Sequence, residues 1–168
     1  MMARAHPTLA LRPYLPADAS LLAEIFRASV EELTEEDYEP AQQEAWASLA
    51  DDEEAFAVRL GKHLALIATL DGSPVGFISL DNPTDIGLFY VHPAAAGQGV
   101  GTMLYDAIEK LATGRGGSHL LVEASDNAIE FFQRRGFEPQ QRNSIAVGDE
   151  WLSNTTMKKK LAAKGAVS

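Results

Sequence analysis

The chain has 168 residues, of which 46% are hydrophobic, and a formal net charge of −10 at pH 7. This length fits one domain with a full core, so we expect residues 1–168 to form a single domain whose tail, 162–168, is frayed. The acidic balance argues against nucleic acid and anionic membranes as partners, and the absence of cysteine excludes disulfides, zinc–thiolate sites and a thiol nucleophile.

The first half of the chain predicts one strand, three helices and three further strands. Residues 8–14 alternate apolar and polar side chains and end among prolines, which is typical of a strand. Residues 18–33 carry apolar side chains at helical spacing, with Asp18 as the expected N-terminal cap. The remaining elements are short helices at 40–49 and 52–60, a hairpin of strands at 63–70 and 75–80, and a strand at 86–92.

The second half predicts a different alternation of elements. A helix at 99–113 is followed by a strand at 120–124, a helix at 126–135, and strands at 142–147 and 151–158. The whole order is mixed α+β, and it lacks the repeated βαβ units of a doubly wound fold.

The segment 90–105 joins a strand to a helix through three glycines at alternate positions, Gly97, Gly99 and Gly101. Because glycine lacks Cβ, main-chain N–H groups in such a turn can approach the oxygens of a ligand closely. The start of the helix adds unpaired N–H groups and the positive end of the helix dipole. The loop is therefore suited to hold an anion, and phosphate is the anion that we expect.

Two common phosphate-binding motifs do not fit this loop. A P-loop requires a lysine that is absent here, since Gly101 is followed directly by Thr102. In the dinucleotide motif G-x-G-x-x-G, the third glycine would fall on Thr102 or Leu104. One argument for a nicotinamide-dependent oxidoreductase remains, because Glu123 ends the next strand where a ribose-binding acid would lie.

Two segments resemble the GCN5-related N-acetyltransferase (GNAT) family. The run Val91-His92-Pro93 followed by the three glycines resembles the family's acetyl-coenzyme A loop, which usually reads Arg/Gln-x-x-Gly-x-Gly/Ala. Residues 128–137, Ala-Ile-Glu-Phe-Phe-Gln-Arg-Arg-Gly-Phe, resemble the family's Asn-x-x-Ala-x-x-Phe-Tyr-x-x-x-Gly-Phe segment. The resemblance implies an acetyl-coenzyme A-dependent N-acetyltransferase with a mixed, mostly antiparallel sheet of about six to seven strands, flanked by helices on both faces.

The resemblance also implies where acetyl-coenzyme A binds. Main-chain N–H groups of the loop would bind the pyrophosphate, and the strand before the loop would pair with the pantetheine arm. The N–H of Val91 would face the thioester oxygen and stabilise the oxyanion, which contributes about 3 kcal/mol in other enzymes. The residues expected to contact the cofactor are Phe89, Tyr90, Val91, Ala96, Gly97, Gln98, Gly99, Val100, Gly101, Thr102, Ser125 and Phe132.

Three positions depart from the family pattern. Ala96 stands where the family has Arg or Gln, Ser125 where it has Asn, and Phe132 where it often has the tyrosine that protonates the leaving thiolate. A simple thiol has a pKa of about 8.5, so we expect its thiolate to leave at neutral pH without such a donor. Tyr90 and Tyr105 are the alternative hydroxyl groups, and Tyr90 is our catalytic candidate. The departures also keep a non-catalytic coenzyme A-binding module open as an alternative.

The acceptor amine must lose a proton before it can attack. An alkyl amine with a pKa of about 10.4 is almost fully protonated at pH 7, and its deprotonation costs roughly 4 to 5 kcal/mol. An acid near the substrate is therefore useful as a general base. Glu32, in the acidic stretch 31–39, is the predicted base, although a solvated helix end explains such a stretch equally well. Glu123 is the other acid near the expected site, and its alternation also fits a surface position.

The acceptor pocket of the family is built from the first helices and the last strands. Here these segments carry Glu31, Tyr38, Trp46, Trp151 and Asn154. Aromatic and acidic side chains suit a cationic amine, because acids attract it and rings contact its charge. We therefore expect the acceptor to be the amine of a small molecule, amino acid or peptide, which attacks the thioester directly.

The remaining expectations concern metals, membranes and self-association. His63 and His119 show no ligand spacing, so we expect no metal. No apolar run is long enough to span a bilayer, which predicts a cytoplasmic protein. A homodimer is compatible with the sequence. The patterns Tyr38-Glu39-Pro40 with Trp46, and 151–157, resemble the YafP-like branch of the family.

Overall fold

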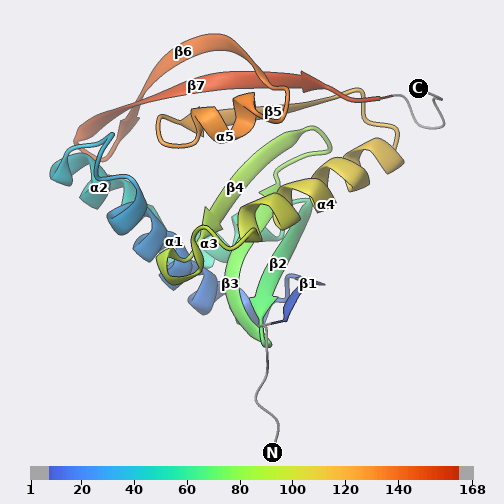
Figure 1. Ribbon diagram of the computed structural model, residues 1–168. Helices are drawn as coiled ribbons and strands as arrows, with labels where there is room; N and C mark the ends of the chain where they lie inside the picture. The colour runs from blue at the N-terminus through green and yellow to red at the C-terminus, as the bar shows by residue number, and fades with distance from the viewer. Residues whose placement is uncertain (1–7, 163–168) are drawn as a thin grey trace, which may run out of the picture.

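The computed structural model describes residues 8–162, whose seven strands form one mixed sheet in the order β1-β2-β3-β4-β5-β7-β6 (Figure 1). Neighbouring strands run antiparallel except β4 and β5, which run parallel. The strands are β1 (Leu9–Pro13), β2 (Leu64–Leu70), β3 (Ser73–Leu80), β4 (Asp85–Val91), β5 (His119–Ser125), β6 (Glu138–Val147) and β7 (Glu150–Lys160). This sheet confirms the predicted fold class. The single parallel pair among the described strands also excludes the doubly wound fold that a nicotinamide enzyme would need.

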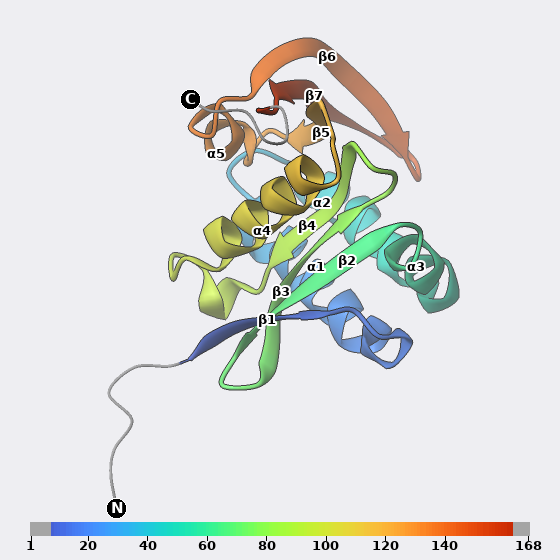
Figure 2. The same ribbon diagram turned by 90° about the vertical axis from the view of Figure 1, so that its right-hand side faces the viewer.

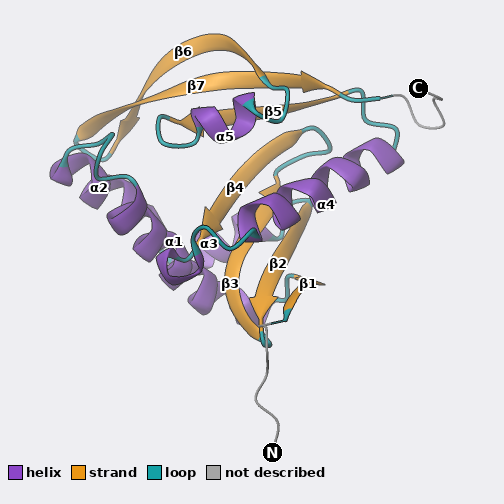
Figure 3. Cartoon of the chain, viewed as in Figure 1, coloured by secondary structure: helices purple, strands orange, loops and turns teal. Residues whose placement is uncertain are grey.

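Helices cover both faces of the sheet, as predicted (Figures 2 and 3). Helices α1 (Ala19–Leu33), α2 (Pro40–Ala47) and α3 (Glu53–Leu60) pack on one face, and α4 (Val100–Gly114) and α5 (Ile129–Gln133) pack on the other. Three short 3-10 turns are η1 (Pro16–Asp18), η2 (Ser48–Ala50) and η3 (Pro93–Ala95).

The two long helices are held by apolar side chains at helical spacing. α1 buries Leu22, Phe26 and Val30, and α4 buries Leu104 and Ile108. Each such side chain contributes roughly 1.5 to 3 kcal/mol on burial. The two layers therefore form separate cores on opposite faces of one sheet.

β4 and β5 pair over only two residue positions, Asp85 with Leu121 and Ile86 with Val122. Just beyond these pairs β4 carries a bulge, where its register with β3 shifts and the N–H of Leu88 donates to the Ser79 hydroxyl at 2.9 Å. A bulge bends its strand and increases the local twist. The C-terminal half of β4 consequently lies outside the β4–β5 ladder, and Figure 1 shows the two strands parting.

Three local expectations were wrong. Helix α5 is shorter than 126–135, because a turn closed by the N–H of Ala128 and the carbonyl of Ser125 precedes it, and no side chain caps it. β6 begins at Glu138 rather than 142, since an exposed polar strand shows no alternation. Asp18 does not cap α1: its carboxylate accepts two hydrogen bonds from Arg12 at 2.8 Å, which hold its pKa below the usual range.

Two remaining expectations concern the ends of the chain and membranes. The frayed tail was predicted for residues 162–168, and of these 163–168 lie outside the described residues. Within 8–162, no helix is long and apolar enough to cross a membrane.

Candidate active site

An open cavity of about 780 Å³ lies where β4 and β5 part. Its walls come from both layers: α1, α2 and α3 on one side, the start of α4 and α5 on the other, with β5 and β7 beyond the opening. The cavity therefore passes through the sheet rather than lying on one face of it. It contains six of the predicted cofactor residues, namely Phe89, Tyr90, Val91, Gly101, Ser125 and Phe132.

The main chain of β4 faces this opening at alternate residues. The N–H of Leu88 donates to Ser79 and the N–H of His92 donates to the Val75 carbonyl, both on β3. Because successive peptide groups of a strand point to opposite sides, the N–H and C=O groups of Phe89 and Val91 point toward the opening. Both N–H groups are thus available to a ligand, and the predicted Val91 is one of them.

The glycine loop lies at one end of the cavity, where Gly101 joins its lining. Gly97 and Gly99 have φ angles of +78° and +83°, and a Cβ at either would meet nothing within 4 Å. Both therefore stand in a left-handed conformation beside open space, which only glycine adopts without strain. Gly101 is helical and close to the Phe131 ring, so it serves close packing instead.

The other loop residues either hold the loop in its conformation or form its exposed surface. Val100 is 1% exposed and packs against Gly76, so it contributes only its main chain to the loop surface. The Gln98 amide donates back to the Ala94 carbonyl at 3.2 Å, and Ala96 is exposed. His92 accepts the N–H of Ala94 through Nδ1, which makes it a turn residue.

Arg135 is a cation beside the loop that the sequence analysis missed. Its guanidinium lies 3.5 Å from the centroid of the Phe131 ring, donates to the Phe131 carbonyl, and donates to the Thr102 hydroxyl at 2.7 Å. The Thr102 hydroxyl thus accepts a hydrogen bond here and retains its own hydrogen to donate to a ligand. Arg135 belongs to the segment 128–137. Ala96 lacks the side chain with which the family pattern contacts phosphate, and this was the sequence signal that another cation should lie nearby.

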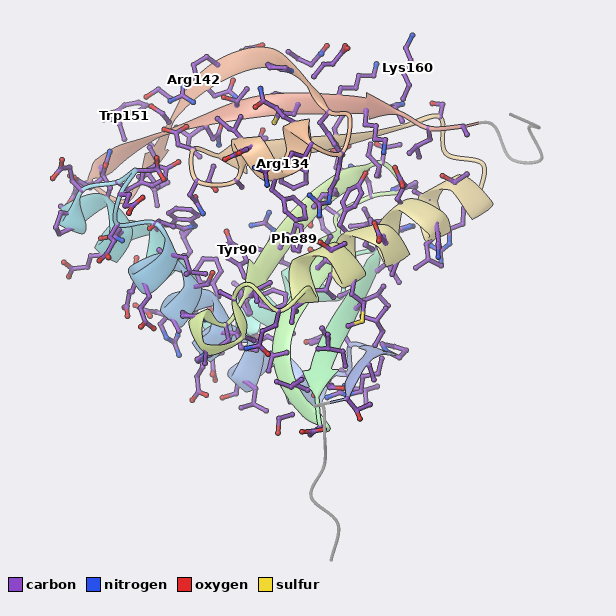
Figure 4. All side chains as sticks on the ribbon, in the orientation of Figure 1. Phe89, Tyr90, Arg134, Arg142, Trp151 and Lys160 are labelled. Atoms are coloured by element: carbon purple, nitrogen blue, oxygen red, sulfur yellow. The ribbon has the colours of Figure 1, made fainter. Side chains whose placement is uncertain are left out.

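Aromatic side chains form the wall on the α1 and α2 side. Phe26, Tyr38, Trp46 and Tyr90 are linked by edge-to-face contacts, with ring centroids between 4.6 and 6.4 Å apart. Trp46 Nε1 donates to the Tyr90 hydroxyl at 3.3 Å, so that hydroxyl keeps its own proton to donate. Burial raises the pKa of Tyr90 to about 12. Figure 4 shows Tyr90 and Phe89 pointing to opposite faces of β4.

Tyr38 and Asn154 line the cavity, but their polar groups are engaged within the protein. The Tyr38 hydroxyl donates to the Ser153 carbonyl at 2.6 Å and accepts the N–H of Asp126 at 2.9 Å. Asn154 Oδ1 accepts from the Asn143 amide. Both residues therefore tie β7 to its neighbours and shape the wall of the cavity.

Three other predicted residues lie outside the cavity lining. Glu31 and Glu32 are exposed on α1, and Trp151 is 65% exposed at the start of β7, at the periphery in Figure 4. Their amphipathic helix and hairpin positions turn them toward solvent. The acids that do line the cavity are Asp81, Asp85 and Glu123, accompanied by Arg59.

The α5 side of the cavity is apolar. Phe132 is 3% exposed and packs among Phe89, Tyr105 and Phe137. The Tyr105 hydroxyl donates to Glu109, and burial raises the pKa of this tyrosine. Tyr105 does not belong to the cavity lining, so Tyr90 and Tyr38 provide its phenolic hydroxyl groups. The residues 8–162 contain no cluster of acids and histidines that could hold a metal.

An open strand edge, a glycine loop at the start of a helix and a cavity lined by aromatic and acidic side chains are suited to an extended, phosphate-bearing ligand beside a second molecule. The family model "Acetyltransferase (GNAT) domain" matches residues 34–161. The "Uncharacterized N-acetyltransferase YafP" of Escherichia coli (strain K12) is 31% identical over 151 residues, 89% of this chain and 95% of that protein. The chain therefore belongs to the GNAT family of acetyltransferases.

Solved structures agree with this assignment. A GCN5-related N-acetyltransferase from Rhodopseudomonas palustris, whose description also reads "Aminotransferase, Class-II", is 57% identical and covers 96% of this chain and 99% of its own, with a TM-score of 0.89. The PaiA N-acetyltransferase of Thermoplasma acidophilum, solved in complex with coenzyme A, shares the fold at 21% identity, with a TM-score of 0.74 over 91% of this chain and 99% of its own.

Proposed function

We propose that this protein transfers the acetyl group of acetyl-coenzyme A to the amine of a small molecule, amino acid or peptide by direct attack on the thioester. The observation that carries the proposal is the parting of β4 and β5, which opens one cavity from Gly101, at the start of α4 beside the phosphate-suited loop, to an acidic, aromatic compartment. Acetyl-coenzyme A, when bound, supplies an acetyl group activated as a thioester.

The residues on the cofactor side fit such a ligand. Open space beside Gly97 and Gly99, the first N–H groups of α4, and the Thr102 hydroxyl suit the pyrophosphate. We infer that the Arg135 guanidinium adds a charged contact, which compensates for the missing side chain at Ala96.

The opening of β4 offers two further donors. Their order along the strand places the N–H of Val91 nearer the loop and that of Phe89 nearer the acidic compartment. We propose that the two hold the pantetheine arm and the thioester oxygen, so oxyanion stabilisation is shared between Phe89 and the predicted Val91. Ser125 and Phe132 form the opposite wall, and on the acceptor side Tyr90 lines the cavity with a hydroxyl that retains its own proton.

The acceptor side favours a cation with an apolar portion. Its lining holds three carboxylates against one guanidinium, Arg59, beside the aromatic wall of Trp46 and Tyr90. Such a compartment attracts an ammonium group and contacts its carbon skeleton.

Thermal shift and thiol release test the proposal together. Saturating coenzyme A or acetyl-coenzyme A should raise the Tm of the parent protein, and NAD should not. A panel of alkyl amines, amino acids, aminoglycosides and short peptides should then reveal thiol release above the rate without acceptor. The absence of a thermal shift would contradict the cofactor assignment, whereas a shift without turnover on any amine would favour the non-catalytic binding module.

A further inference from the structure

Asp81, one residue beyond β3, places a carboxylate in the acceptor side of the cavity. Its Oδ2 accepts from Arg59 of α3 at 3.3 Å. Its Oδ1 is buried and has no hydrogen-bond partner among the described residues. Buried carboxylate oxygens are normally hydrogen-bonded, so this one requires an explanation.

The carboxylate lies directly on Gly87, in the bulged part of β4. A Cβ at residue 87 would stand 2.2 Å from Asp81 Oδ1 and 2.4 Å from its Cγ, too close for any side chain. Gly87 has no positive φ, so backbone conformation does not require glycine here. The glycine therefore leaves room for the Asp81 carboxylate over the centre of β4.

Stability does not account for this arrangement. The ion pair of Asp81 with Arg59 is partly exposed, at 24% and 46% for the two side chains, and such pairs contribute little to stability. The unpartnered Oδ1 is destabilising, because a buried acceptor without a hydrogen bond has lost its hydration. A glycine in a strand also weakens the strand. These costs together exceed the gain, which points to a role in binding or reaction.

We propose that Asp81 is the general base, and that its carboxylate receives the ammonium group of the acceptor; this proposal rests on the acetyltransferase function proposed above. Gly87 stands two residues before Phe89, about 7 Å along the strand. An amine between these positions lies beside both the carboxylate and the thioester. Asp81 itself lines the cavity, so its carboxylate can meet the ammonium group there.

The proton movements follow from the overall reaction. The ammonium gives one proton to Asp81, and the nitrogen lone pair then forms a bond to the acetyl carbonyl carbon. The C–S bond breaks with its electron pair on sulfur, and the second proton leaving the nitrogen ends on that sulfur. Asp81 returns its own proton to solvent, so the reaction yields an amide, a free thiol and one released proton.

The other titratable and charged groups of the cavity are Arg59, Asp85, Glu123, Tyr38 and Tyr90. Asp85 already accepts the Thr84 hydroxyl at 2.8 Å, and Glu123 is exposed. Arg59 donates to one oxygen of Asp81 and so helps to place the carboxylate before the amine arrives. Among the three acids of the cavity, Asp81 thus has one oxygen paired with a cation and one without a hydrogen-bond partner among the described residues.

Substitution with an isosteric amide tests this role. Asp81→Asn should lower kcat for alkyl amines about 100-fold or more, the scale of general-base catalysis, and leave the Tm shift by coenzyme A unchanged. The loss should be much smaller for an aryl amine, which is already neutral at pH 7. Glu54→Gln, an exposed acid of α3 outside the cavity, is the charge-matched control and should behave as the parent.

A relocated carboxylate makes the test independent of folding defects. The double variant Asp81→Gly with Gly87→Asp moves the carboxylate to residue 87, whose Cβ would occupy the position of the present Asp81 carboxylate. Its kcat should be at least tenfold higher than that of Asp81→Asn. Full activity of Asp81→Asn, or a comparable loss on alkyl and aryl amines without rescue, would overturn the role of Asp81. If Glu123→Gln selectively lost activity on alkyl amines while Asp81→Asn kept full activity, the general base would be Glu123 on β5 rather than Asp81. A parent inactive on every amine would overturn the proposed function as well.

Discussion

Arg135 offers the sharpest test of the cofactor site, because the side chain bridges α5 and the start of α4. Replacement by methionine keeps an apolar stem against the Phe131 ring and removes the guanidinium. A charge-assisted hydrogen bond to phosphate contributes about 1.5 to 3 kcal/mol, equal to about a 10- to 150-fold change in Kd. Since Arg135 is partly exposed, we expect the lower end, about tenfold weaker binding of coenzyme A.

The neighbouring residue provides the control for this change. Arg134 is exposed (Figure 4) and, within residues 8–162, forms an ion pair with Glu130 of α5 alone, so Arg134→Met should leave the Kd unchanged. Isothermal titration at two salt concentrations should show a smaller salt dependence for Arg135→Met than for the parent. 3′-Dephospho-coenzyme A distinguishes the pyrophosphate from the 3′-phosphate as the group contacted. Equal affinities of the two arginine variants would refute the assignment of Arg135.

Three further expectations address the loop, the leaving group and the acceptor wall. Gly99→Ala and the remote Gly116→Ala share a positive φ and open surroundings, so each should lose about 1 to 2 kcal/mol of stability, but only Gly99→Ala should reduce the Tm shift by coenzyme A. Phe132→Tyr should change kcat less than threefold, because we expect the thiolate to leave without a proton donor at this position. A tenfold gain in kcat in steady-state kinetics would contradict this expectation. Trp46→Phe should raise the KM of the amine several-fold by removing the donor to Tyr90, whereas the exposed Trp151→Ala should not, and the reverse pattern would place the acceptor near β7.

Much of the fold follows from local sequence signals. The strands β2, β3 and β4 carry apolar residues bounded by Gly, Asp and Pro, and their predicted bounds lie within about two residues of the observed ones. Gly97 and Gly99 indicated a loop whose main chain a ligand can approach, because glycine lacks Cβ, and a Cβ at either position would indeed meet nothing within 4 Å. The element order distinguished an α+β sheet from a doubly wound one without any knowledge of contacts.

The acceptor side was less accessible to the same reasoning. Glu32 and Trp151 have the right residue types in the right segments, yet the helix face and the hairpin end that carry them point to solvent. Side-chain direction in irregular turns depends on tertiary packing, which periodicity does not report. The carboxylate of Asp81 lies beyond a strand end, where no period constrains it. Gly87 was nevertheless a visible signal, since an isolated glycine within a strand indicates a bulge or a close approach.

The geometry of β4 also limits which acceptors fit. Gly87, Phe89 and Val91 follow one another along β4 at a rise of about 3.3 Å per residue, so together they span about 13 Å. The Asp81 carboxylate lies at Gly87, the thioester is proposed to lie near Phe89, and Val91 is the end next to the glycine loop. We propose that the cofactor occupies the C-terminal part of this line, since its phosphate end is proposed to lie at the start of α4. The acceptor would then enter from the other end, past Phe56 and Arg59 of α3. An ammonium on a narrow carbon chain reaches Asp81 along this path, whereas a branched amine meets the α3 side chains first, so KM should rise with branching next to the nitrogen while kcat falls little.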